Sequence, residues 1–123
     1  MKKAPLRHKI IKDDVFEATV ILFWGGNFHC VNNYMVKNYG INFDEGLLSD
    51  KYSFGFVSER LADDLNGWAF WVGDTKDVST LVHECIHLIY RIFEYKSIDI
   101  KTSEEVVAFY AGYWFKRIQD IVG

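Results

Sequence analysis

The stretch TLVHECIHLIY, residues 80–90, places the strongest constraint on how this chain can fold. Apolar residues recur around it at helical spacing and would form one stripe of a helix: Val78, Val82, Cys85, Ile89 and Ile92. We therefore predict a helix over residues 74–95, with Asp74 as its N-cap and Asp77 in its first turn. His83 and His87 lie off the apolar stripe, and their i, i+4 spacing places both imidazoles on one helix face.

The segments around this helix predict a single domain, residues 1–123, of the α/β (α+β) class. A small sheet would pack against the motif helix and a C-terminal helix. The expected elements are, in order, a loosely ordered lead-in at 1–13, a buried strand at 15–24, a helix at 27–40, strands at 51–59 and 68–73 that form an antiparallel hairpin, and helices at 74–95 and 102–123.

Composition narrows the class of protein further. Half of the 123 residues are hydrophobic and 17% are aromatic, so the chain can fill a core. A net charge of -3 argues against a nucleic-acid partner. The apolar run at residues 18–24 is too short to span a bilayer, so no membrane partner is expected. Two cysteines, Cys30 and Cys85, make no disulfide framework, which favours reduced thiols and a cytoplasmic location.

Residues 83–87, HECIH, match the H-E-x-x-H arrangement of metalloproteases. Two neutral imidazoles can bind one Zn²⁺ ion, and Glu84, next to His83, can act as general base on its water. A catalytic zinc needs a third protein ligand, for which we nominate Glu105, with Glu104 as the alternative. Two interpretations without a metal compete with this one. The short H-E-x-x-H motif could match by chance, and Glu105 could form a capping box with Thr102 instead of binding zinc.

The pattern HECIH, followed after 17 residues by EVVAF, resembles that of the gluzincins. It is also similar to small phage and prophage proteins with HE-x-x-H … E-x-x-A-Y-x-x-G-Y, although Phe109 stands where Tyr is common. The resemblance covers roughly residues 67–115. It implies a zincin-like fold, zinc bound by His83, His87 and Glu105, Glu84 as the base, and hydrolysis of peptide bonds.

Other side chains are weaker candidates. Tyr110 and Tyr113 could stabilise an oxyanion or contact substrate, although aromatic residues on a helix more often fill a core. Arg91 could orient Glu84 or a substrate carboxylate, although a solvated arginine is the simpler interpretation. The simpler interpretation of Trp68, Phe70 and Trp71 is packing within a strand. In zincins, however, a strand beside the active helix binds extended substrate by β-addition, and we nominate GWAFWVG, residues 67–73, for that role.

These observations favour a zinc-dependent peptidase that hydrolyses a peptide bond through a zinc-bound water activated by Glu84. Its partner would be a peptide or protein substrate, and the sequence does not indicate an oligomeric state. The alternative, from another class, is a non-catalytic protein stabilised by zinc, such as a phage factor that engages a host protein. A small chain leaves little length for specificity pockets, which favours that alternative.

Overall fold

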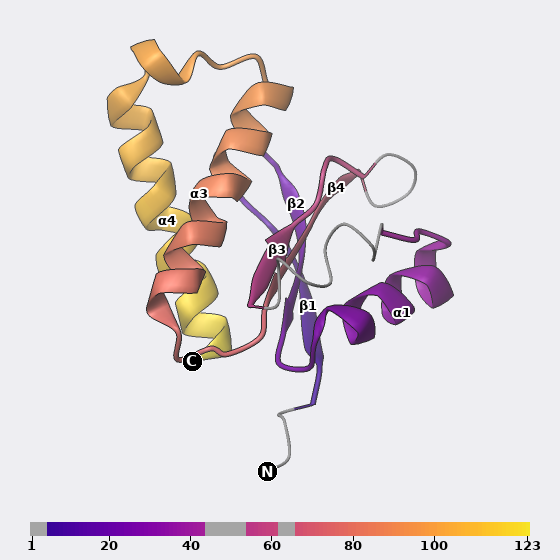
Figure 1. The fold of residues 1–123 in the computed structure, drawn as a ribbon. Helices are drawn as coiled ribbons and strands as arrows, with labels where there is room; N and C mark the ends of the chain where they lie inside the picture. Colours follow the sequence, from indigo (N-terminus) through magenta and orange to yellow (C-terminus); the bar gives the residue numbers. More distant parts are fainter. Residues whose placement is uncertain (1–4, 44–53, 62–65) are drawn as a thin grey trace.

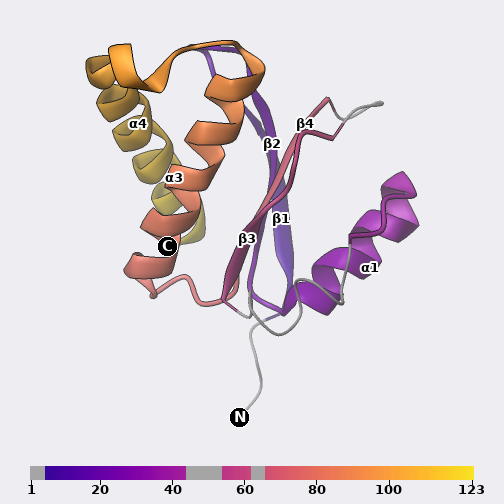
Figure 2. The same cartoon turned by 45° about the horizontal axis from the view of Figure 1, so that its top comes forward.

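The computed structural model describes residues 5–43, 54–61 and 66–123, and a four-stranded mixed sheet forms its centre. The strands lie in the order β1-β2-β4-β3, with bounds β1 Arg7–Lys12, β2 Thr19–Trp24, β3 Gly55–Val57 and β4 Gly67–Val72. Helix α1 (Phe28–Tyr39) covers one face, and α3 (Val78–Tyr95) and α4 (Glu104–Val122) cover the other (Figures 1 and 2). A short 3-10 helix, η1 (Ile100–Thr102), precedes α4. The predicted α/β class is confirmed.

The central strands β2 and β4 are apolar along their length because helices cover both faces of the sheet. They pair in parallel, with Thr19 opposite Gly67, while β1–β2 and β3–β4 pair antiparallel. Alternate residues of β2 enter two separate cores: Val20 and Leu22 join the core under α3 and α4, whereas Ile21 and Phe23 join the core under α1.

Strand β1 falls within the stretch that we expected to be a loose lead-in, so that expectation is wrong from Arg7 onward. Only Ile11 of this strand is buried, and the other five residues face solvent. A polar strand at the edge of a sheet has no apolar alternation to reveal it, and lysines such as Lys9 are common at such edges. The hairpin of β3 and β4 is confirmed, although residues 51–53 of the expected strand lie outside the described chain.

The helix starts differ from the predicted caps. Asp77, not Asp74, caps α3: its carboxylate accepts from the Thr80 backbone N–H (3.1 Å) and hydroxyl (2.7 Å), and these bonds lower its pKa. Ser103, not Thr102, occupies the N-cap of α4, and its side chain makes no capping bond. The capping box of Thr102 and Glu105, which was the alternative to a ligand role for Glu105, is therefore not formed, because the chain is still in η1 at Thr102.

Within the described ranges, no helix is long and apolar enough to cross a membrane. Cys30, on the surface, and Cys85, in the core, are both free thiols.

Candidate metal centre

His83 and His87 turn the same ring nitrogen toward each other on the exposed side of α3. The two Nε2 atoms lie 3.1 Å apart, and the ring planes meet at 76°. Two nitrogens each about 2.0–2.1 Å from a tetrahedral zinc would lie about 3.3 Å apart. The pair therefore has a separation close to that needed to share one ion.

The surroundings of His87 favour the form of imidazole that binds a metal. Partial burial lowers its pKa, and the positive charges of His83 and Arg91 lower it further. A neutral ring keeps a nitrogen lone pair available, whereas a protonated ring has none.

Glu84 is buried between α3 and strand β3, with only 5% of its surface exposed. Burial raises the pKa of its carboxyl, and the charges of His83 and Arg91 partly oppose that shift. The structure records no hydrogen bond to this carboxylate from the residues it describes. A buried carboxyl with a raised pKa, one residue from a histidine pair, has the properties of a general base.

The position of Glu84 corrects our assignment of the apolar stripe on α3. Val78 and Val82 are exposed, and the face that packs on the sheet consists of Leu81, Glu84, Cys85, Leu88, Ile89, Ile92 and Phe93. The buried stripe is thus rotated relative to the predicted one, and it includes the carboxylate. The prediction that both histidines lie off the stripe is confirmed.

The structure does not bring Glu105 to the histidine pair. Both Glu104 and Glu105 are exposed in the first turn of α4. Across the described residues, no three His, Cys, Asp or Glu side chains gather as a metal-binding group. The reason is topological: α4 runs back along α3, so its first turn lies near the end of α3, whereas His83 lies in the first half of α3 and His87 at its middle (Figure 1).

The two candidate tyrosines are engaged elsewhere. Tyr110 is fully buried and donates its hydroxyl to Asp13 Oδ2 at 2.5 Å, and burial together with this bond raises its pKa. The Tyr113 hydroxyl accepts from Arg117 at 2.7 Å. In this arrangement neither hydroxyl is free to stabilise charge at the histidine pair.

Sequence reasoning missed Asp13, which is the acceptor at the centre of a buried network. Its carboxylate is 1% exposed and accepts from the backbone N–H groups of Val15, Phe16 and Ala18 as well as from Tyr110. The one available signal was the adjacent pair Asp13-Asp14, because aspartate is typical of turns. This network ties the β1–β2 turn to α4.

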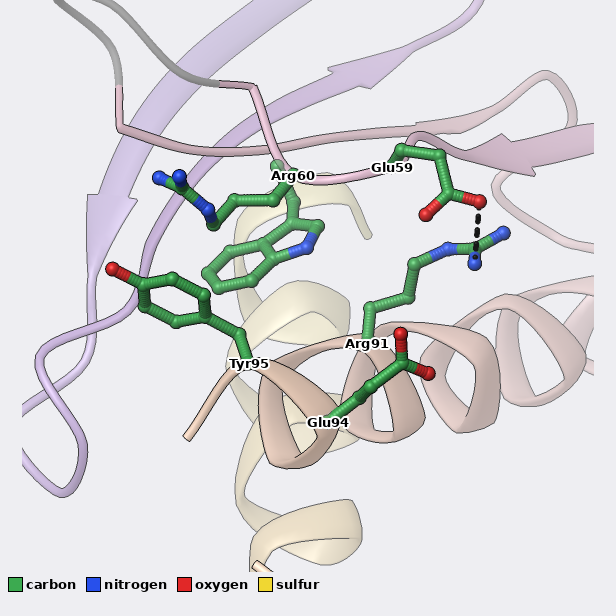
Figure 3. A pocket seen from close by; sticks show the side chains of 6 residues that line it. Glu59, Arg60, Arg91, Glu94 and Tyr95 are labelled. Carbon is green, nitrogen blue, oxygen red and sulfur yellow. Dashed lines mark ion pairs between the residues drawn. The ribbon is translucent and has the colours of Figure 1, made fainter. Parts of the chain in front are cut away.

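Arg91 pairs with Glu59, at 3.0 Å, rather than with Glu84 (Figure 3). Its side chain is 34% exposed, so it is partly buried and not the solvated arginine of the simpler interpretation. Glu59 lies two residues beyond the end of β3, which places this ion pair between that end and α3.

The prediction that residues 67–73 bind an extended peptide by β-addition was wrong. Strand β4 pairs with β2 on one side and β3 on the other, so both of its hydrogen-bonding edges are used. Strands β1 and β3 are the two edge strands of the described sheet, and β3 is the one that packs against α3 beside Glu84. An added peptide strand needs such an edge.

Comparison with protein-family models, characterised proteins and solved structures finds no significant match to this chain.

Proposed function

We propose that the protein is a zinc-dependent peptidase whose metal is held by His83 and His87. The observation that supports this most strongly is the 3.1 Å separation of the two Nε2 atoms on the exposed side of α3. Zinc at this pair would polarise a carbonyl and lower the pKa of its water to near 7.

Glu84 is the proposed general base. Its raised pKa suits a group that accepts a proton from the attacking water and returns it to the leaving amine. Its burial against β3 keeps it close to the edge along which an extended peptide would lie.

We propose Glu105 as the third ligand, with Glu104 as the alternative. A site with two histidines and one glutamate is a common catalytic zinc set. Either choice requires the first turn of α4 to lie nearer the histidines than it does in this arrangement. The N-cap Ser103 makes no side-chain capping bond, so this turn has one restraint fewer than a capped helix start.

The test compares wild type with Glu84→Gln, which keeps the shape of the side chain but cannot accept the proton. Zinc content and the free energy of unfolding should stay close to those of wild type. Turnover of a peptide library should fall roughly 10²–10⁴-fold. Equal turnover by both proteins would refute the peptidase mechanism and leave the metal site standing.

A second candidate, a zinc-stabilised binding protein, is favoured by the surface around the histidines. Val82, Ile86 and Tyr90 repeat at i, i+4 spacing on α3, and each is at least 40% exposed. An exposed apolar row of this kind suits contact with a protein partner. For this candidate, Glu84→Gln should leave partner binding unchanged, while Ile86→Asp should abolish it.

The cytoplasmic location belongs to the proposal as well, because free thiols are typical of reducing compartments. A role in phage biology depends on the sequence resemblance alone.

A further inference from the structure

A pocket of about 150 Å³ opens between the end of β3, the start of β4 and the second half of α3 (Figure 3). None of its lining residues is a proposed zinc ligand or the proposed base. Its lining consists of Glu59, Arg60, Trp68, Arg91, Glu94 and Tyr95.

Two hydrogen-bond donors in this lining have no acceptor among the residues that the structure describes. Trp68 is 2% exposed, and its indole Nε1 is buried without a partner. The Nε atom of Arg91 is likewise buried and unpaired, while another nitrogen of the same guanidinium binds Glu59. Buried donors are rarely left unsatisfied, so two of them at one pocket indicate a ligand that accepts hydrogen bonds.

Contacts among the lining residues hold the aromatic side of the pocket, Trp68 and Tyr95, in place. The Arg60 guanidinium lies 4.4 Å from the centre of the Tyr95 ring and donates to the Asn66 side chain at 2.6 Å. Trp68 meets Tyr95 edge to face at 5.8 Å. Arg60 is therefore held as a fixed positive charge, and Arg91 is the cation that can exchange its partner.

Glu59 is the partner that can be exchanged. Its side chain is 80% exposed, and a single exposed ion pair contributes little to stability. A ligand carboxylate that displaced Glu59 would pair with the Arg91 guanidinium. Because Glu59 would then no longer cover this side of the pocket, the carboxylate could also accept hydrogen bonds from Arg91 Nε and Trp68 Nε1. Glu94 is exposed at the rim, where solvent screens its charge.

The distance from Glu84 sets the register of a bound peptide. Arg91 follows Glu84 by seven residues on α3, which is about 10.5 Å along the helix axis. That distance corresponds to about three residues of an extended peptide. Strand β3 runs from Gly55, beside Glu84, toward Glu59, beside Arg91. A peptide added antiparallel to β3 therefore places its more N-terminal residues at the pocket.

We propose that this pocket binds an acidic side chain of a peptide, about three residues N-terminal to the bond beside Glu84. The register depends on the proposed peptidase site, whereas the carboxylate binding itself does not. We choose the antiparallel direction because antiparallel pairs are slightly more stable than parallel ones. A parallel peptide would instead place its more C-terminal residues at the pocket, where a C-terminal carboxylate could take the place of the acidic side chain.

The experiment measures binding without hydrolysis, with Glu84→Gln protein and acetylated, amidated alanine-based octapeptides that carry one Glu. Matched peptides carry Gln at the same position, and a third set has a free C-terminal carboxylate and no Glu. Indole N–H resonances report the site, because only four tryptophans are present. The Trp68 signal should move with the Glu peptide, while that of Trp114, which is buried on α4 and does not line the pocket, should stay in place.

Variants add a second criterion. Arg91→Gln should weaken binding at least about tenfold, the loss expected for a hydrogen bond to a charged group. Glu59→Gln should tighten binding, because it removes the competing carboxylate. Lys116→Gln breaks a comparable exposed ion pair with Asp120 on α4 and should change nothing.

Equal binding of the Glu and Gln peptides, or weaker binding by Glu59→Gln, would overturn the proposal. Binding by the free C-terminus alone would overturn the acidic side chain as the ligand. These results do not depend on cleavage, so a protein that binds the Glu peptide and hydrolyses nothing would refute only the peptidase.

Discussion

Gly55 of β3 and Glu84 of α3 approach so closely that a Cβ at position 55 would lie 2.8 Å from Glu84 Cγ. The same Cβ would lie 2.9 Å from Cγ2 of Thr80. Both neighbours belong to the helix that carries the histidine pair. The absence of a side chain at Gly55 therefore sets how near the candidate base lies to the edge strand.

Gly55→Ala should destabilise the protein by about 1–3 kcal/mol, the usual cost of overpacking, and should displace Glu84. If Glu84 is the base, turnover should fall while zinc content stays constant. Gly112→Ala is the matched control, because a Cβ there meets nothing within 4 Å. In a helix interior that change should stabilise by up to about 1 kcal/mol. Urea unfolding measures the free energy of unfolding of both variants. Equal changes in the two would contradict the close contact between Gly55 and Glu84.

The third ligand can be identified by a pair of variants at the start of α4. Glu105→Gln should weaken zinc affinity by more than about 100-fold, since loss of a ligand should exceed loss of an outer-shell contact. Glu104→Gln should leave zinc affinity unchanged. Competition with a chelator measures both affinities. Unchanged zinc affinity in the two variants would show that neither carboxylate is a ligand.

The pH dependence of stability should report His87. Its pKa is lower in the folded protein than in the unfolded chain, so the unfolded chain takes up the proton more readily. Without metal, the free energy of unfolding should therefore fall as pH drops below about 6.5, the ordinary pKa of histidine. His87→Asn should remove this part of the slope. Identical slopes in wild type and variant would contradict the lowered pKa.

The Asp13 network predicts a difference in stability between two single changes. Asp13→Ala leaves several donors without an acceptor and should cost at least about 3 kcal/mol. Tyr110→Phe removes one hydrogen bond and should cost about 1 kcal/mol. Chemical denaturation tests the order of the two effects, and a larger loss for Tyr110→Phe would contradict the assignment of Asp13 as the common acceptor.

The two thiols should differ in reactivity. Cys30 is exposed, whereas burial and the neighbouring Glu84 carboxylate raise the pKa of Cys85 to about 12. A thiol reagent at pH 8 should modify one cysteine per folded chain and two per denatured chain, as measured by mass. Cys30→Ser should leave none reactive in the folded protein. Rapid modification of Cys85 in that variant would show that the core opens.

Most of the fold could be predicted because its central elements have strong local patterns. Strands β2 and β4 are continuous apolar runs, and Gly40 ends α1 in the left-handed conformation that a C-cap glycine adopts. The polar strand β1 has no such pattern. Its position depends on hydrogen bonds to β2, which no local sequence signal specifies.

The candidate site was predictable only where its residues share one helix. The i, i+4 spacing of His83 and His87 predicts that both imidazoles lie on one face of α3, and the structure places their Nε2 atoms next to each other. The distance of Glu105 from the histidines depends on how α4 lies against α3, which is decided by tertiary packing. The burial of Glu84 and the pairing of Arg91 with Glu59 also depend on how β3 and the residues after it lie against α3.

The parallel pairing of β2 with β4 has a consequence for synthesis on the ribosome. Thr19 and Gly67 are paired but lie 48 positions apart, and long-range parallel pairing of this kind forms slowly. A growing chain therefore carries β2 with one edge unpaired and its apolar faces partly uncovered until β4 and α3 have emerged. Nascent chains in that state are prone to associate with one another. Refolding yield should accordingly fall as protein concentration rises, and slow translation downstream of residue 24 should favour aggregation over folding.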